Sequence, residues 1–232
     1  LLTLLTMFLV TFLSLDLAVG EPIIWSEERQ LTFDLVANTT IPDDDRMPSI
    51  TATRDNKIWV AWRSDVIMGN YEIFYKKYDP ITGNWTNDIR FTFNPTKVDT
   101  NPAILQTSDN KTWFFWVSDK TGNYELFYKT TSNNGASWST ETQLTTYSGS
   151  DVSPALTQTN DGKIWLVWTR TTSNEDIYYR TYDGTSWSDE NQLTTNTDND
   201  HLSTITQAKD GKIWVFWSRY MLTEDHDHIW CK

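Results

Sequence analysis

Four short apolar segments with nearly the same sequence recur along the chain. They read KIWVAW, KTWFFW, KIWLVW and KIWVFW, and they begin at Lys57, Lys111, Lys163 and Lys212, so successive copies lie 54, 52 and 49 residues apart. Each copy is apolar at consecutive positions and contains β-branched and aromatic residues, which is the pattern of a strand covered on both faces. The sequence therefore predicts one fully buried strand in every repeat.

Three further segments accompany each apolar strand in a fixed order. An Asp-x-x-Pro element precedes it, and a second strand-like segment and a Trp-[Ser/Thr]-x-[Asp/Glu] element follow it. No stretch of the repeats carries apolar residues at helical spacing. Four strand signals in a period near fifty residues predict an all-β protein, a β-propeller of four-stranded antiparallel blades. The rival fold is a β-sandwich, whose strands do not recur as near-identical quartets.

The order of these elements predicts the boundaries of the blades. The mature region, 21–232, would contain a closing strand at 25–32, complete blades at 45–92, 99–145 and 151–194, and an incomplete blade at 200–232. Residues 25–32 could complete the last blade and close a four-bladed ring. We favour the alternative, in which about four blades of a six- or seven-bladed ring are represented and the chain is a fragment, because it stops within a strand.

The first twenty residues differ from everything that follows. Residues 1–20 form an almost uncharged apolar run that ends in small residues, as in a secretory signal peptide. A buried helix and an uncut membrane anchor are the alternatives, but the run is short for a bilayer span. We therefore expect a secreted or cell-surface protein that is not an integral membrane protein after the signal is removed.

Composition excludes several classes of function. The 232 residues carry a formal net charge of −12, and the few Lys and Arg residues do not cluster, so nucleic acid is not an expected partner. The single cysteine, Cys231, excludes an internal disulfide framework and a cysteine-based zinc site. No cofactor is predicted.

A turn motif stands between the third and fourth strand signals of two repeats. The second repeat has Thr131, Asn133, Gly135, Ser137 and Trp138, and the third has a version one residue shorter with Asp183, Gly184, Ser186 and Trp187. These segments resemble the Asp-box of BNR-repeat β-propellers in the sialidase superfamily, with Asn for Asp and Ser for Thr in the second repeat. The resemblance implies a structural turn, in which Asp or Asn bonds backbone amides, Gly has a positive φ and Trp fills the blade.

The same resemblance directs attention to arginines. In the sialidase superfamily, three arginines hold the substrate carboxylate, and a tyrosine and an aspartate act in catalysis. Structural residues recur in every blade, so catalytic candidates are residues that break the repeat. Arg46 and Arg63 qualify, and Arg170 and Arg219 could add positive charge to substrate binding. Asp65 is a candidate acid/base; the recurrence of Asp119 at its counterpart favours a turn role as the alternative. No tyrosine with a partner glutamate can be assigned. The alternative for Arg46 is a surface arginine neutralised by residues 43–45.

The segment Glu224–His228 has two histidines at alternate positions. On an extended strand His226 and His228 would share a face, as in a metal site. Because no third ligand can be placed, we interpret the segment as a solvated loop, and no metal site is predicted. The acidic loops at 43–45 and 198–200 lack the spacing of a calcium loop.

Two functions from different classes follow. The first is a non-catalytic, sialidase-like propeller that binds a glycan or an extracellular protein; the similarity among repeats favours it, because few residues are left for specialised chemistry. The second is an exo-α-sialidase-like glycoside hydrolase, which Arg46 and Arg63 would support.

Overall fold

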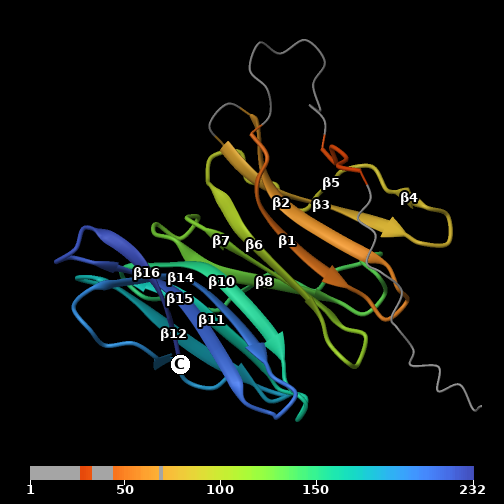
Figure 1. Ribbon diagram of the computed structural model, residues 1–232. Helices are drawn as coiled ribbons and strands as arrows, with labels where there is room; N and C mark the ends of the chain where they lie inside the picture. The colour runs from red at the N-terminus through yellow and green to blue at the C-terminus, as the bar shows by residue number, and fades with distance from the viewer. Residues whose placement is uncertain (1–26, 33–43, 68–69) are drawn as a thin grey trace, which may run out of the picture. The chain divides into compact units, whose positions relative to one another are not determined.

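The computed structural model describes residues 27–32, 44–67 and 70–232 (Figure 1). The expected signal segment, residues 1–20, lies outside the described residues. The chain divides into a short N-terminal unit, Leu1–Leu31, and a main unit, Thr32–Lys232, which are described separately. Within the part expected to be a closing strand, residues 27–32 form no regular strand, and residues 25 and 26 are not described.

The described residues of the main unit form four antiparallel sheets and no helix (Figure 1). Blade 1 contains β1 (Arg46–Ala52), β2 (Ile58–Ile67), β3 (Asn70–Asp79), β4 (Asn84–Trp85) and β5 (Ile89–Arg90). Blade 2 contains β6 (Asp99–Gln106), β7 (Thr112–Ser118), β8 (Glu125–Thr131) and β9 (Thr142–Gln143). Blade 3 contains β10 (Ser150–Gln158), β11 (Ile164–Thr171), β12 (Glu175–Tyr182) and β13 (Asn191–Gln192). Blade 4 contains β14 (Asn199–Gln207), β15 (Ile213–Met221) and β16 (His226–Cys231). This arrangement confirms the predicted all-β propeller with four antiparallel blades.

The outermost strands are much shorter than the sequence predicts. The eight-residue Trp-[Ser/Thr]-x-[Asp/Glu] elements contain pairings of only two residues, as in β9 and β13. In blade 2 two backbone bonds flank β9, from Ser139 N to Thr130 O and from Leu144 N to Leu126 O, both 2.8 Å. The tryptophan of the element, Trp138, directly precedes Ser139 and packs against the core. A short, interrupted edge strand offers little unpaired backbone for pairing with another chain.

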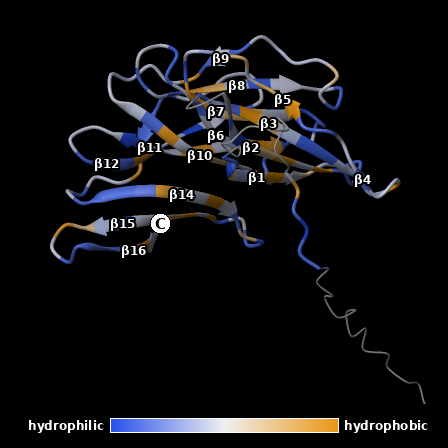
Figure 2. Ribbon diagram, turned by 90° about the horizontal axis from the view of Figure 1, so that it is seen from above, coloured by the Kyte–Doolittle hydropathy of each residue, from blue (hydrophilic) through white to orange (hydrophobic). Residues whose placement is uncertain are grey.

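The core lies between the blades. Phe114 and Trp116 on one face of β7 belong to a buried cluster with Trp59 and Ala61 of β2, whereas the other face of β7 packs against blade 3. Figure 2 shows hydrophobic stretches along the strands, including β2 and β14. Because the two faces of one strand contact two different blades, the second strand of each repeat is apolar at consecutive positions, as predicted.

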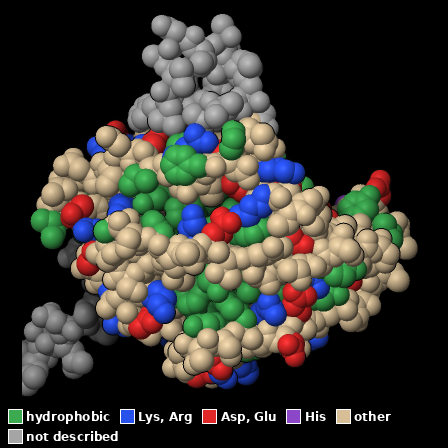
Figure 3. Space-filling model, turned by 180° about the vertical axis from the view of Figure 1, so that it is seen from behind, with side chains coloured by type: hydrophobic (Ala, Val, Ile, Leu, Met, Phe, Trp, Pro, Cys, Tyr) green, Lys and Arg blue, Asp and Glu red, His purple; other side chains and the backbone are tan. Residues whose placement is uncertain are grey.

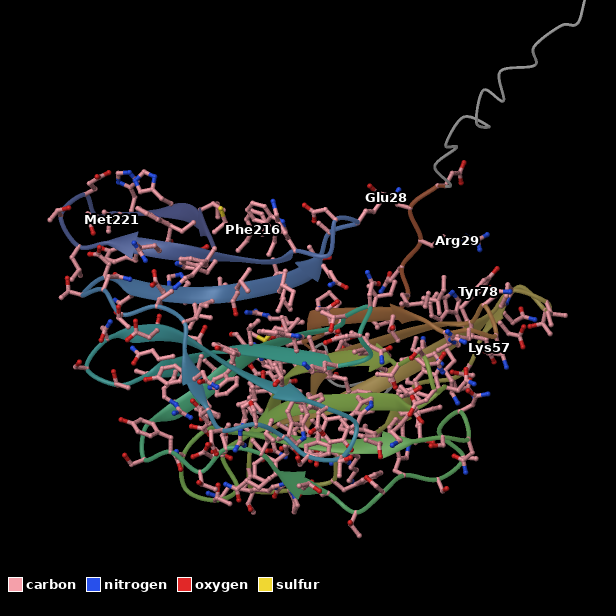
Figure 4. The ribbon with its side chains drawn as sticks, turned by 90° about the horizontal axis from the view of Figure 1, so that it is seen from below. Glu28, Arg29, Lys57, Tyr78, Phe216 and Met221 are labelled. Carbon is pink, nitrogen blue, oxygen red and sulfur yellow. The ribbon has the colours of Figure 1, made fainter. Side chains whose placement is uncertain are left out.

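One face of blade 4 is less covered than its counterparts. Trp214 and Phe216 of β15 are 37% and 38% exposed, whereas Trp113 and Phe115 at the matching positions of β7 are 4% and 0% exposed. Phe216 is labelled in Figure 4. Among the described residues, no further blade covers this face.

The innermost strand of every blade has an irregularity at the same position. In each blade the pairing of the first strand (β1, β6, β10 or β14) with the second strand shifts register near its start. The bulged residues at these shifts have positive φ: Met47 (56°), Asn101 (47°), Ser153 (55°) and Leu202 (54°). Proline follows the bulged residue in blades 1–3, where it removes a backbone donor that a regular ladder would need. The Asp-x-x-Pro element is therefore a β-bulge signal.

The four bulges surround a hollow at the centre of the main unit. It has a volume of about 210 Å³ and is lined by Met47, Pro48, Asn101, Pro102, Ser153, Pro154, Leu202 and Ser203. Every one of these side chains is uncharged. The hollow therefore offers van der Waals contacts and a few polar groups to a small ligand, and no charge.

Candidate functional site

The blades have two ends with different character. We call the end where the first strand begins and the second strand finishes the variable end, because the residues after the first-strand aspartate differ: Arg46, Thr100, Val152 and His201. We call the opposite end the constant end, because similar hairpin turns and Asp-box-like turns recur there. Lys57 and Tyr78 lie at the constant end of blade 1 (Figure 4). Candidate binding residues gather at the variable end.

An aspartate accepts a hydrogen bond from a tryptophan at the variable end of three blades. The indole Nε1 of Trp62, Trp168 and Trp217 donates to Asp45, Asp151 and Asp200 at 3.0, 2.9 and 2.9 Å. In blade 2 the Nε1 of Trp116 has no hydrogen-bond partner among the residues described. These aspartates hold the first strand against the second, so their recurrence has a structural cause.

Arg170 and Arg219 join these aspartates as counter-ions. The Arg170 Nε and Nη2 atoms each donate to Asp151 at 2.7 Å, and Nη1 donates to Glu190 at 2.7 Å. Burial lowers the pKa of Arg170, but the hydrogen bonds and charges of Asp151 and Glu190 outweigh it and raise the pKa. The Nε and Nη2 atoms of Arg219 likewise donate to the two carboxylate oxygens of Asp200, at 2.6 and 3.0 Å. Both guanidinium groups are occupied within their own blades.

Arg46 and Arg63 lie opposite each other across β1 and β2. Directly opposed residues of an antiparallel pair project from the same face, so the two arginines share one side of blade 1. The Arg46 side chain is 63% exposed, and its Nε donates to Asp44 Oδ1 at 2.6 Å. The structure therefore brings these two sequence-predicted residues together.

Arg63 differs from the other three candidate arginines because no carboxylate within the described residues pairs with it. Its guanidinium carbon lies 4.1 Å from the ring centre of Tyr71, and Nη1 donates to Thr100 Oγ1 of blade 2 at 3.2 Å. Its Nε is buried and has no hydrogen-bond partner among these residues. A buried donor without an acceptor costs about 1–3 kcal/mol.

The Arg63 site borders the central hollow. The Thr100 hydroxyl that accepts from Arg63 also contacts the sulfur of Met47 at 3.5 Å, and Met47 lines the hollow. The site thus combines a cation, an aromatic ring and a hydroxyl at the rim of a neutral cavity. We call Arg46, Arg63, Tyr71 and Thr100 the rim site.

Sequence reasoning found the arginines of the rim site but missed the other two members. Tyr71 recurs as Tyr124, so a search for residues that break the repeat rejects it. Thr100 was visible only as the counterpart of Arg46 in the next repeat. Contact across a blade boundary gives both residues their place, and no local sequence signal reports it.

The proposed acid/base Asp65 lies two residues beyond Arg63 in β2 and is half-buried. Its repeat counterpart Asp119 accepts the backbone N–H of Val98 at 2.9 Å. Within the part of the chain that is described, Asp65 has neither a hydrogen-bond nor an ion-pair partner.

The Asp-box-like turn of blade 2 is tightly bonded. Thr131 Oγ1 accepts the Gly135 N–H at 3.1 Å, and Asn133 Oδ1 accepts the Ser137 N–H at 3.0 Å. Gly135 has φ of +78°. Trp138 packs against the cluster between blades 1 and 2, with its ring centre 4.8 Å from that of Phe91.

The shorter turn of blade 3 uses the same chemistry. Asp183 Oδ1 accepts the N–H groups of Thr185 and Ser186 at 2.8 and 2.9 Å, and Gly184 has φ of +102°. Trp187 packs against the cluster between blades 2 and 3. In both turns the tryptophan fills the boundary with the preceding blade, so these residues act in stability.

Charged side chains do not form one large basic surface on the face shown in Figure 3. Lys and Arg side chains there lie among acidic and uncharged ones. No helix among the described residues is long and apolar enough to cross a membrane.

No protein-family model matches the chain, and no curated protein matches it. Solved structures do resemble it. A protein of unknown function from Dyadobacter fermentans has a TM-score of 0.66 and 13% identity over 82% of this chain and 66% of its own. An α-L-arabinanase of Penicillium chrysogenum, solved with arabinobiose, has a TM-score of 0.65 and 10% identity over 81% of this chain and 62% of its own.

A third similar structure is the NanB sialidase of Streptococcus pneumoniae. Its TM-score is 0.55 and its identity 14%, over 78% of this chain and 28% of the sialidase. The present chain thus spans about two thirds or less of these three proteins. At such low identity the likenesses show a shared propeller fold, found in proteins whose names include an arabinanase and a sialidase.

Proposed function

We propose that this protein is a non-catalytic, secreted or cell-surface binding module, and that its ligand is a glycan carrying a carboxylate, bound at the rim site. The observation that carries the proposal is the state of Arg63. Three of the four candidate arginines have carboxylate partners within 2.7 Å, whereas Arg63 is half-buried, has no such partner among the described residues and keeps a buried Nε–H without an acceptor.

The surroundings of Arg63 suit a sugar acid. A guanidinium group binds carboxylates through paired, charge-assisted hydrogen bonds. The Tyr71 ring lies against the guanidinium of Arg63, and the neutral hollow beside Met47 can receive the rest of a small glycan. Arg46 lies opposite Arg63 on β1, but its charge is paired with Asp44, so Arg63 supplies the unmatched positive charge. The resemblance of the fold to carbohydrate-active propellers is in keeping with this ligand class.

The lining of the hollow favours binding over hydrolysis. Most glycoside hydrolases place two carboxyl groups on either side of the scissile bond. The eight residues around the hollow carry none, and Asp151 and Asp200 are engaged by tryptophan and arginine. A sialidase-like hydrolase remains the second candidate, because Tyr71 contacts Arg63 and tyrosine is the nucleophile that the family resemblance implies.

The test compares acidic with neutral glycans. We expect the purified chain to bind sialylated or uronic-acid glycans on an array and not to bind their neutral parent sugars. We expect Arg63→Ala to remove this selectivity. Arg54→Ala is the matched control, since Arg54 is an exposed arginine at the constant end of the same blade. Equal retention of acidic and neutral glycans by the wild type would refute the proposal.

A second assay separates binding from hydrolysis. Release of a fluorogenic group from an α-linked sialoside, abolished by both Arg46→Ala and Arg63→Ala, would establish the hydrolase. Binding of acidic glycans without any turnover is the result that our proposal predicts.

A further inference from the structure

All three histidines of the chain lie at the variable end of blade 4. His201 follows Asp200 on β14, and His226 and His228 are at alternate positions of β16. A turn of four residues joins β15 to β16, and within it Asp225 has φ of +60° while its N–H bonds Met221 O at 2.9 Å. This turn folds Glu224 back beside β16, which places a carboxylate next to two imidazoles.

The three side chains converge on one point. Glu224 Oε2 lies 3.3 Å from His226 Nε2 and 3.0 Å from His228 Nε2, and the three candidate ligand atoms all lie within 4.8 Å of one another. Ligand atoms about 2.05 Å from a tetrahedral metal ion are separated from one another by about 3.3 Å. The two separations therefore match those of a zinc site. His226 and His228 lie on strand β16, so the interpretation of this segment as a loop is wrong for these two residues.

The hydrogen bond of His226 fixes which nitrogen can act as a ligand. His226 Nδ1 lies 2.8 Å from the backbone oxygen of Glu224. A carbonyl oxygen only accepts, so Nδ1 carries the proton and, in the neutral ring, Nε2 presents a lone pair. That lone pair faces a carboxylate oxygen, and two acceptors face each other unless a proton or a cation lies between them. A backbone hydrogen bond to the far nitrogen is also the usual outer support of a metal-bound histidine.

Both histidines depart from the repeat. The strand register places His228 where Asp176 stands in blade 3, since they pair with Arg219 and Arg170. His226 correspondingly takes the place of Asn174, whose side chain bonds the Asn196 carbonyl at 2.9 Å. The scaffold of the other blades uses an amide and a carboxylate here, so scaffold geometry does not explain an imidazole pair.

Neighbouring acids do not compete for the two imidazoles. Asp225 accepts a hydrogen bond from the hydroxyl of Tyr220, and Asp227 lies 3.4 Å from His201 Nε2. A cation here would also meet a chain of net charge −12.

We propose that Glu224, His226 and His228 form a surface site for a divalent transition-metal ion of the zinc class, with two nitrogen ligands, one oxygen ligand and a fourth position open to water or to a partner's side chain. Imidazole and carboxylate together suit Zn²⁺. Bound metal would link the β15–β16 turn to the last described strand. This proposal is independent of the rim site.

The test is a calorimetric titration of the untagged 232-residue chain with ZnCl₂ at pH 7.5. We expect one ion per chain, and we expect His226→Ala, His228→Ala and Glu224→Ala each to weaken binding at least tenfold. His201→Ala is the matched control, because it removes the third histidine and leaves the three proposed ligands; its affinity should stay within about twofold of the wild type. As a second readout, Zn²⁺ should raise the melting temperature of the wild type and of His201→Ala but not that of His228→Ala.

The proposal is overturned if the wild type binds no Zn²⁺, if the three ligand variants bind as tightly as the wild type, or if His201→Ala weakens binding as much as they do. All four residues are partly or fully exposed, so these variants should fold, and their melting temperatures without metal will show it.

Discussion

Blades 2 and 3 each bury an aspartate at the same position of the repeat, but only in blade 3 is its charge paired. In blade 3, Asp151 accepts from Trp168 and from two nitrogens of Arg170, so its charge is matched. In blade 2, Asp99 is 3% exposed and the residue opposite it is Ser118 in place of an arginine. Burial raises the pKa of Asp99 to about 6, against the opposing effect of the nearby Ser118 and Thr92 hydroxyls.

The difference between the two blades explains the arginines. Arg170 and Arg219 neutralise the buried aspartates of blades 3 and 4, so breaking the repeat is not by itself a sign of ligand binding. Arg63 stands one register position away from this pairing, opposite Arg46, and has no aspartate to neutralise. An arginine is a binding candidate when the scaffold leaves its charge unmatched.

The largest expected effect comes from removing the matched aspartate. Asp151→Ala leaves the buried Arg170 with only Glu190 and leaves Trp168 Nε1 without its acceptor, and breaking a buried ion pair from one side costs about 3–5 kcal/mol of unfolding free energy. Urea denaturation at pH 7 measures the loss. Asp99→Ala, which breaks no ion pair, is the comparison; a loss as large as that of Asp151→Ala would contradict the contrast between the blades.

The unmatched aspartate should make stability depend on pH. Because the pKa of Asp99 is raised in the folded protein, the native state binds more protons than the unfolded state between about pH 4 and pH 6. Its contribution to the unfolding free energy therefore falls as pH rises through this window, by about 2–3 kcal/mol, and is constant above it. Asp99→Asn should flatten this part of the profile; an unchanged profile would show that Asp99 is ionised in both states.

Blade 3 can be given the chemistry of blade 2. Arg170→Ser introduces the residue type that blade 2 carries at the matching position, and we expect it to cost about 2 kcal/mol at pH 8, since Asp151 loses its charge-assisted hydrogen bonds from Arg170 but keeps the one from Trp168. Blade 3 should then share the pH dependence that Asp99 gives blade 2, so the loss should shrink as pH falls toward 5. Denaturation curves at the two pH values test this, and a loss that is independent of pH would speak against a role as counter-ion.

The smallest effect on stability is expected at the rim site. Arg63→Ala removes the contact with Tyr71 and one hydrogen bond to Thr100, but it also removes the buried Nε–H that has no acceptor, so unfolding free energy should change by less than about 1 kcal/mol. Thermal melting measures it. A drop of several kcal/mol would make Arg63 a structural residue.

The fold could be predicted from the sequence, because repetition of a buried strand such as Lys163–Trp168 and of its turns constrains the blade strongly. The outer strands were predicted too long. The similarity among the repeats of this chain covers the turn and its tryptophan as well as the two residues that pair in the strand. The roles of the arginines could not be predicted. Asp151 and Arg170 meet through strand register, and Glu224 reaches the histidines through a left-handed turn residue, and neither contact has a sequence signature.

The most direct test of the central claim is a titration of the purified chain with sialyllactose and with lactose, by calorimetry or by NMR of Trp and Arg side chains. We predict that sialyllactose binds and lactose does not, that Arg63→Ala weakens sialyllactose binding about ten- to a hundredfold through the loss of charged hydrogen bonds, and that Arg54→Ala leaves it unchanged. Equal affinity of the folded Arg63→Ala variant and the wild type would contradict the assignment of the unmatched arginine to ligand binding.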